Sequence, residues 1–178
     1  RPPVSDVRTL GASSHPADLG TRRCDVPDEA QVWALCEASE AEYGVVDVAV
    51  NCAGLGIGLK PVVDLELKDW QVNIDVMATG AFLFARQAAR TMVAADTPGR
   101  IITIASRAGK TAIPNLAAYS SSKFAVIGLT QALAAEPGGH GITVNTVCPG
   151  TIATPLPPVQ GGPYDTFPRP LPHSHAGS

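Results

Sequence analysis

Three short runs rich in β-branched residues alternate with longer stretches of helical periodicity along the middle of the chain. The runs are 45–50, 100–105 and 142–147, and loop-forming Asn, Ser or Pro-Gly residues follow each of them at once. Short apolar runs bounded by turn residues are typical of buried strands. The sequence therefore predicts three strands, with polar or turn residues at the end of each.

Helical stretches separate these strands. We predict helices over about residues 27–43, 73–95 and 117–136, with Asp25 as the N-cap of the first. Strands that alternate with helices form right-handed βαβ crossovers. The expected fold class is therefore α/β, a doubly wound parallel sheet with helices on both faces.

The two ends of the chain lack this pattern. From Pro155 onward seven of 24 residues are proline and hydrophobic periodicity is absent, which is typical of irregular structure. We expect one domain over residues 1–154, with its core within 21–154, and an irregular tail over 155–178. A single domain also suits a chain of 178 residues.

Composition and charge narrow the function classes. Hydrophobic residues make up 45% of the chain and charged residues 16%, a balance that supports a folded core. The net charge is -3 and the 13 basic residues are scattered, so we expect no nucleic-acid partner.

The most apolar stretch is far shorter than the roughly 20 residues of a membrane span, and no signal pattern is visible. We expect a cytoplasmic protein with no membrane partner.

The four cysteines lie far apart in the sequence and form no Cys-x-x-Cys motif. We interpret them as reduced structural residues and expect no metal site.

Two helical segments, 79–85 and 124–129, are apolar around their whole circumference. One side of each is expected to pack on the sheet and the other on a further surface. Two interpretations stay open: plain burial within the fold, or homo-oligomerisation through the helices at about 73–95 and 117–136.

Candidate chemistry lies where the predicted strands end, because ligands of open parallel sheets bind at the carboxyl ends of the strands. The residues there are Asn51-Cys52-Ala53-Gly54, Ser106 and Cys148-Pro149-Gly150. Tyr119 and Lys123, spaced i and i+4 near the start of a helix, share one helix face. A lysine ammonium beside a phenol favours the phenolate, so Tyr119 is a candidate general acid/base.

These motifs resemble the short-chain dehydrogenases/reductases over about residues 21–154. The matching features are Asn51-Cys52-Ala53-Gly54, Ser106 thirteen positions before Tyr119, Tyr119-x-x-x-Lys123, and Pro149-Gly150-Thr151-Ile152-Ala153-Thr154. Tyr-x-x-x-Lys alone is a weak signal, but four motifs, each at the expected place, are specific. The resemblance implies a Rossmann-like fold and an NAD(P)-dependent oxidoreductase that interconverts a small-molecule alcohol and carbonyl by hydride transfer.

The resemblance also implies roles for individual residues. Ser106 would bind the substrate oxygen, Tyr119 would exchange its proton, and Lys123 would favour the phenolate and bind the nicotinamide ribose. A larger set would line the NAD or NADP site: Asp25 at the adenine, Asn51, Ala53 and Gly54 on the adenosine side, and Pro149, Gly150, Ile152 and Thr154 at the nicotinamide end. The residue that would distinguish NAD from NADP follows a second strand, for which the sequence shows no counterpart.

Each of these residues also has a purely structural interpretation. Asp25 can be a helix cap, Asn51 and Gly54 can form a turn, and Ser106 can end its strand. The Tyr-x-x-x-Lys pair can belong to a solvated helix face.

Three features depart from the family pattern. No glycine-rich Thr-Gly-x-x-x-Gly-x-Gly loop with its strand and helix precedes Asp25, and 24 residues are too few for that unit. Met77 stands where the family has a catalytic asparagine, with Asn73 one turn earlier as a candidate substitute. Beyond Thr154 the family's substrate-covering segment has no counterpart. We therefore expect a truncated chain, and the alternative to an active enzyme is a catalytically silent remnant that acts as an interaction or scaffold protein.

Overall fold

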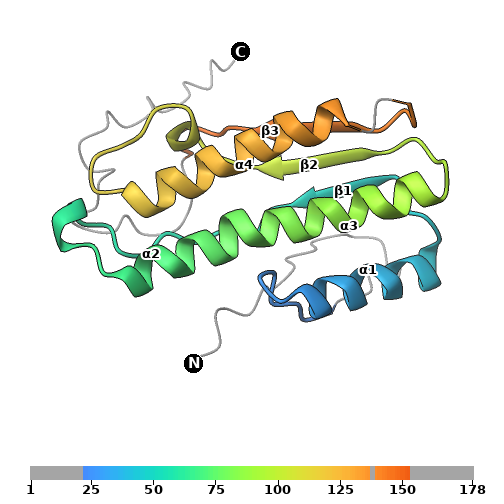
Figure 1. Ribbon diagram of the computed structural model, residues 1–178, viewed down its shortest axis with the longest axis horizontal. Helices are drawn as coiled ribbons and strands as arrows, with labels where there is room; N and C mark the ends of the chain where they lie inside the picture. The colour runs from blue at the N-terminus through green and yellow to red at the C-terminus, as the bar shows by residue number, and fades with distance from the viewer. Residues whose placement is uncertain (1–21, 137–138, 153–178) are drawn as a thin grey trace, which may run out of the picture.

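The computed structural model describes residues 22–136 and 139–152. Its elements, labelled in Figure 1, are α1 (Glu29–Tyr43), β1 (Val48–Asn51), the 3-10 turn η1 (Val62–Asp64), α2 (Leu67–Asn73), the π-helical turn η2 (Ile74–Thr79), α3 (Gly80–Ala94), β2 (Arg100–Ile104), the 3-10 turn η3 (Arg107–Gly109), α4 (Ala117–Ala135) and β3 (Thr143–Val147). Thr154 and the tail expected over 155–178 lie outside the described residues.

The three strands form one parallel sheet in the order β1-β2-β3. Arg100 of β2 pairs with Val48 of β1 on one side and with Thr143 of β3 on the other. All three strands lie within three residues of their predicted bounds. The predicted α/β fold class is confirmed, and the carboxyl ends of the strands share one edge of the sheet.

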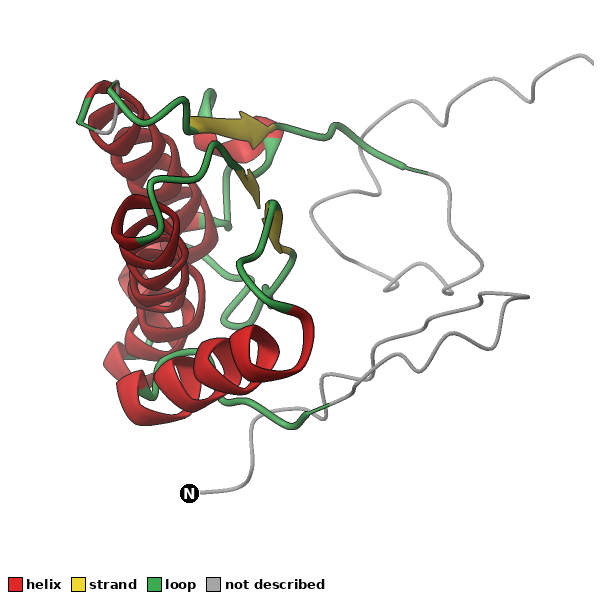
Figure 2. Cartoon of the chain, turned by 90° about the vertical axis from the view of Figure 1, so that its right-hand side faces the viewer, coloured by secondary structure: helices red, strands yellow, loops and turns green. Residues whose placement is uncertain are grey.

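The described helices cover one face of this sheet. Helix α3 packs on β1 and β2, α4 packs on β3, and α1 packs against α3, as Figure 2 shows from the side. Each strand is added on the same side of the preceding one, so right-handed crossovers place both connecting helices on the same face. The sequence predicted helices on both faces of the sheet. Within the described residues, helices cover one face. On the other face Val48, Val50 and Val147 are about half exposed.

The core lies between the sheet and α3. Ala49, Ile101 and Val144 of the strands pack against Met92 of α3. A smaller cluster of Ala81, Ala105 and Val126 lies nearer the carboxyl ends of the strands. Burial of these side chains holds α3 and α4 against the sheet and positions the residues that follow the strands.

Helix α1 begins at Glu29, and its N-cap is Asp28. Asp28 Oδ1 accepts a hydrogen bond from Gln31 N at 3.1 Å, and this bonding lowers the pKa of Asp28. The prediction of Asp25 as the cap was wrong, because a turn closed by Asp28 N donating to Asp25 O at 2.9 Å comes first, and the helix begins only after Asp28. The backbone N–H of Asp25 instead donates to Gln31 Oε1 at 2.9 Å.

The helix predicted over 73–95 begins six residues earlier, at Leu67. Its first turn follows Glu66, whose side chain makes no capping hydrogen bond, so no capping signature marks the start. The π-helical turn η2 joins α2 to α3. All four cysteines are free thiols. Within residues 22–136 and 139–152, no helix has the length and apolar character needed to cross a bilayer.

Candidate functional site

The segments that follow β2 and β3 are joined by backbone hydrogen bonds. Ala105 N donates to Val147 O at 2.8 Å, and Arg107 N donates to Pro149 O at 2.9 Å. Two of the predicted site segments, the one with Ser106 and the one with Pro149 and Gly150, therefore lie side by side at the carboxyl edge of the sheet.

Ser106 lies two residues after the end of β2 and caps η3. Its backbone is extended, and its Oγ accepts a hydrogen bond from Ala108 N at 3.1 Å. The hydroxyl hydrogen remains available to donate. Gly109, the last residue of η3, approaches α4 closely: a Cβ there would lie 2.7 Å from Lys123 O. The turn that carries Ser106 is thus pressed against the backbone of Lys123.

Lys123 is buried, with 5% of its surface exposed. Its Nζ donates a hydrogen bond of 2.8 Å to Ile104 O, at the end of β2, and lies 5.7 Å from the centroid of the Tyr119 ring. That distance is within the range of a cation–π interaction. Burial lowers the pKa of Lys123, while the thiols of Cys52 and Cys148 act in the opposite direction. A solvated helix face is therefore the wrong interpretation of this lysine.

The loop after β1 passes over the same pair. Asn51 is buried, and its Oδ1 accepts a hydrogen bond from Ala53 N at 2.9 Å. A Cβ at Gly54 would lie 3.6 Å from Lys123 Nζ, and one at Gly56 would lie 3.7 Å from Tyr119 Cδ2. The two glycines leave the space beside lysine and tyrosine free of side chains.

Gly56 is a site residue that the sequence motifs did not single out. Its signal in the sequence is the glycine at every second position from 54 to 58. That pattern does not match a dinucleotide-binding fingerprint, because Leu59 stands where the last glycine belongs. The structure gives these glycines another role: Gly54 and Gly56 allow the loop to approach α4 closely, and Gly58 allows it to approach Leu65 and Asp69.

Met77 and Asn73 lie on the helix beneath this loop. Met77 is 1% exposed, and its Sδ would be 3.9 Å from a Cβ at Gly54. The thioether therefore borders the same space as the Lys123 ammonium. The amide of Asn73 is directed elsewhere, because its Nδ2 donates to Ile57 O and Asp69 O. Its N–H groups are used on these two carbonyls, so Asn73 does not take the place of the family's asparagine.

Asp25 and Ile152 make no recorded contact with this cluster within the described residues. Asp25 is exposed, ahead of Val26, which packs against Gly80 at the start of α3. Ile152 is 65% exposed. No hydrogen bond, ion pair or ring contact within the described ranges joins Asp25 or Ile152 to Ser106, Tyr119 or Lys123.

Comparison with known proteins shows the family of this chain. The sequence profile of the short chain dehydrogenase family matches residues 7–160. The chain belongs to the short-chain dehydrogenase family. It is 38% identical over 158 residues to D-threitol dehydrogenase of Mycolicibacterium smegmatis, a match that covers 85% of this chain and 60% of that enzyme.

Two solved structures also resemble this chain. An NADPH-bound actinorhodin polyketide ketoreductase with the substitution F189W is 40% identical, with a TM-score of 0.71, over 75% of this chain and 51% of that one. An NAD+-bound xylitol dehydrogenase is 34% identical, with a TM-score of 0.71, over 74% of this chain and 50% of that one. The chain therefore spans between half and three fifths of the length of these relatives.

Proposed function

We propose that this short-chain dehydrogenase is an NAD(P)-dependent oxidoreductase that interconverts an alcohol and a carbonyl. The observation that carries the proposal is the position of Lys123. Its ammonium is buried, is anchored to Ile104 O at 2.8 Å and lies 5.7 Å from the centroid of the Tyr119 ring. A tyrosine that acts as an acid and a base needs a fixed cation of this kind.

The glycines of the loop beside Tyr119 and Lys123 support a nucleotide site at this place. Without a side chain at either position the backbone lies against the pair: a Cβ at Gly54 would be 3.6 Å from Lys123 Nζ and one at Gly56 would be 3.7 Å from Tyr119 Cδ2. When bound, the nicotinamide supplies or accepts the hydride. Lys123 would hold the ribose beside it.

The remaining contacts to NAD or NADP are assigned by family resemblance. They are Asn51, Ala53 and Gly54 on the adenosine side, Asp25 at the adenine, and Pro149, Gly150, Ile152 and Thr154 at the nicotinamide end. The xylitol dehydrogenase is bound to NAD+ and the ketoreductase to NADPH, which supports either nucleotide.

Each catalytic side chain has one task in the proposed reaction. Tyr119 gives its hydroxyl proton to the carbonyl oxygen during reduction and takes a proton from the alcohol during oxidation. Lys123 stabilises the phenolate that forms between these steps. Ser106 donates its hydroxyl hydrogen to the substrate oxygen, because its Oγ already accepts from Ala108 N. The named activities of the relatives, D-threitol dehydrogenase and a ketoreductase, support a small-molecule alcohol or carbonyl as substrate.

A thermal melt of the chain with and without excess NADH or NADPH tests the proposal first. Binding to the folded state adds about 2.7 kcal/mol of stability at a hundredfold excess over the dissociation constant, which raises the melting temperature by roughly 5–10 °C. A rise with either nucleotide supports the proposal and shows which nucleotide is preferred. No rise with both supports the alternative of a catalytically silent remnant.

Tyr119→Phe tests the catalytic assignment. It removes one oxygen atom, so we expect a loss of turnover of at least about a hundredfold with the nucleotide-dependent rise in melting temperature retained. Unchanged turnover would show that Tyr119 is not the acid/base.

We also propose that the protein forms a homo-oligomer through α3 and α4. Phe82 on α3 and Phe124 on α4 are 40% and 45% exposed, although their neighbours Ala81 and Val126 are buried. Exposed aromatic residues beside a buried helix face are typical of an interface. The cytoplasmic location expected from the sequence stays a prediction that a fluorescent fusion would test.

A further inference from the structure

Asn73 is a polar residue at a core position. None of its surface is exposed, and its Oδ1 has no hydrogen-bond partner within the part of the chain that the structure describes. A buried amide with an unpaired oxygen is unfavourable for folding. An apolar side chain would serve packing better, so the reason for an amide lies in its two N–H groups.

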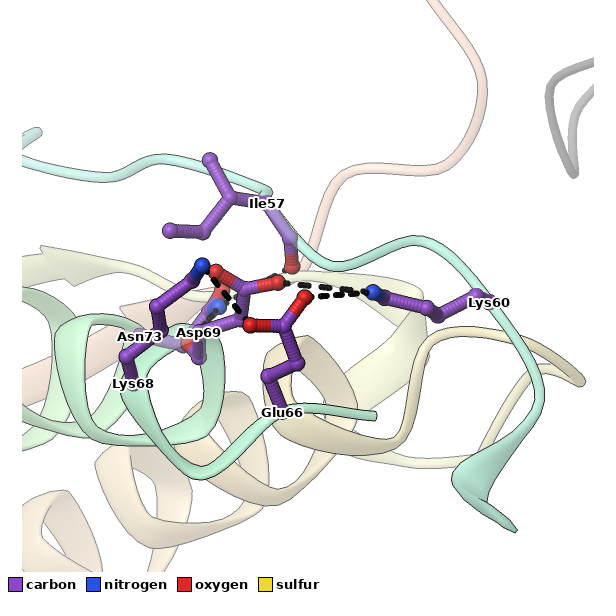
Figure 3. Close-up of polar contacts among 6 residues, drawn as sticks. All are labelled: Ile57, Lys60, Glu66, Lys68, Asp69 and Asn73. Carbon is purple, nitrogen blue, oxygen red and sulfur yellow. Dashed lines mark hydrogen bonds and ion pairs between the residues drawn. The ribbon is translucent and has the colours of Figure 1, made fainter. Parts of the chain in front are cut away.

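The two N–H groups of Asn73 join α2 to the loop that leaves β1. Nδ2 lies 3.1 Å from Ile57 O, sixteen residues earlier in the chain, and 2.7 Å from Asp69 O in its own helix. Figure 3 shows the three residues together where the loop passes α2. One primary amide thus serves two carbonyl oxygens, one on each side of the contact.

The same contact is reinforced by the backbone around Gly58. Gly58 has a φ of 65° and lies so close to α2 that a Cβ would be 2.7 Å from Leu65 Cδ1 and 2.8 Å from Asp69 Cβ. Lys60 adds an exposed ion pair of 3.3 Å to Glu66 (Figure 3), which contributes little because solvent screens it. The buried link between helix and loop is the amide of Asn73.

The loop held in this way is the one that borders the site. Gly56, directly before Ile57, lies against Tyr119, and Gly54 lies against Lys123. We propose that Asn73 is a positioning residue that sets the distance of the loop 54–58 from Tyr119 and Lys123, and with it the room for the nicotinamide end of the nucleotide. This inference rests on the proposed function. Asn73 acts through the backbone of Ile57 and touches neither substrate nor cofactor.

Replacement of the amide by a carboxyl group of the same shape tests the role of the N–H groups. In Asn73→Asp an ionised carboxylate would turn oxygen atoms toward Ile57 O and Asp69 O, so both hydrogen bonds are lost. A protonated carboxyl group has one O–H and restores one of them. Burial raises the pKa of such a carboxyl group, so the defect should diminish as the pH falls.

Hydrogen–deuterium exchange of the full chain without nucleotide measures the loop directly. At pH 8 we expect Asn73→Asp to speed exchange in residues 54–60 at least tenfold, with exchange in β2 and α4 unchanged and the difference smaller at pH 5. The matched control is Asn145→Asp, because Asn145 is exposed on β3 and its amide donates to Thr143 Oγ1 at 3.4 Å, with no further side-chain hydrogen bond among the described residues. Equal protection of the loop in Asn73→Asp and the control at pH 8 overturns the proposal. If Asn73→Asp does not fold, Asn73→Val replaces it, because valine removes both hydrogen bonds without adding a charge. Equal protection of the loop in Asn73→Val and the control would then overturn the proposal.

Steady-state kinetics connect the loop to the nucleotide. We expect Asn73→Asp at pH 8 to raise the KM for the nucleotide at least tenfold, to change kcat less than threefold and to recover toward pH 5. A residue that only stabilises the fold would reduce the amount of folded protein and leave this KM unchanged, so an unchanged KM overturns the positioning role. If the wild-type chain itself neither binds a nucleotide nor turns over, the proposed function fails, while the exchange experiment still decides whether Asn73 holds the loop.

Discussion

The contact between η3 and α4 depends on the absence of a side chain at Gly109, and Gly109→Ala tests it. The added Cβ would lie 2.7 Å from Lys123 O, 2.8 Å from Lys123 C and 3.0 Å from Ile127 Cδ1. Ordinary contacts begin at 3.4 Å, so η3 has to move by about 0.7 Å to relieve the overlap. Two of these three atoms are backbone atoms of a helix of 19 residues, so α4 cannot yield as a flexible side chain would.

We expect Gly109→Ala to lower the free energy of unfolding by about 1–3 kcal/mol, the range of other overpacked sites. The melting temperature should fall by about 2–4 °C for each kcal/mol in a chain of this size. The same movement displaces Ser106, which caps η3. If the proposed reaction is correct, kcat/KM should fall roughly ten- to a hundredfold.

Urea unfolding followed by circular dichroism measures the change in stability. Gly128→Ala is the matched control, because it adds the same methyl group within α4, where no atom of the described residues outside the helix's own backbone and the two neighbouring residues lies within 4 Å of the new atom. We expect this control to gain about 0.5–1 kcal/mol from helix propensity. If Gly109→Ala unfolds at the same urea concentration as the wild type while the control is stabilised, the steric reasoning is refuted.

Three further predictions follow from the site and its surroundings. Met77→Asn puts a hydrogen-bonding amide beside Gly54 and Lys123, so kcat should rise, and an equal or lower kcat in steady-state assays would contradict a missing proton relay. Because burial lowers the pKa of Lys123 below its ordinary value of 10.5, the unfolded chain binds the proton more tightly than the folded chain. The wild type should therefore gain stability relative to Lys123→Met as the pH rises through the window between the lowered pKa and 10.5. A difference in urea midpoint that is constant from pH 7 to 10 would show that the lysine is not buried as described. Phe124→Ser should shift the protein toward the monomer in light scattering with its cooperative melt retained, and an unchanged molar mass would count against an interface on α4.

The strands were predictable because β-branched runs that end in Asn, Ser or Pro-Gly leave few alternatives. The helix starts were harder to predict. Asp25 and Asp28 flank Pro27, and only the path of the chain decides which carboxylate reaches the N–H of Gln31. The start at Leu67 carries no capping signature, since the Glu66 side chain makes no capping bond.

In the candidate site, the sequence predicted side chains but not the backbone atoms that they contact. Ser106 was predicted from the end of the strand that it follows, and Tyr119 and Lys123 from their i, i+4 spacing on a helix. The anchor of Lys123 was not, because it is the carbonyl oxygen of Ile104, and a backbone carbonyl leaves no mark in a sequence. The direction of the Asn73 amide depends on the path of a loop sixteen residues away, which helical periodicity does not contain.

The π-helical turn Ile74–Thr79 is the place where the long helix from α2 to α3 can change its length. A π-turn holds more residues than an α-turn, so the deletion of one residue here can be absorbed by a return to α-helical geometry. The same deletion within α3 would rotate every later side chain by about 100° about the helix axis. Met92, now fully buried, would then turn away from the sheet. Insertions and deletions of single residues among descendants of this chain should therefore collect at 74–79.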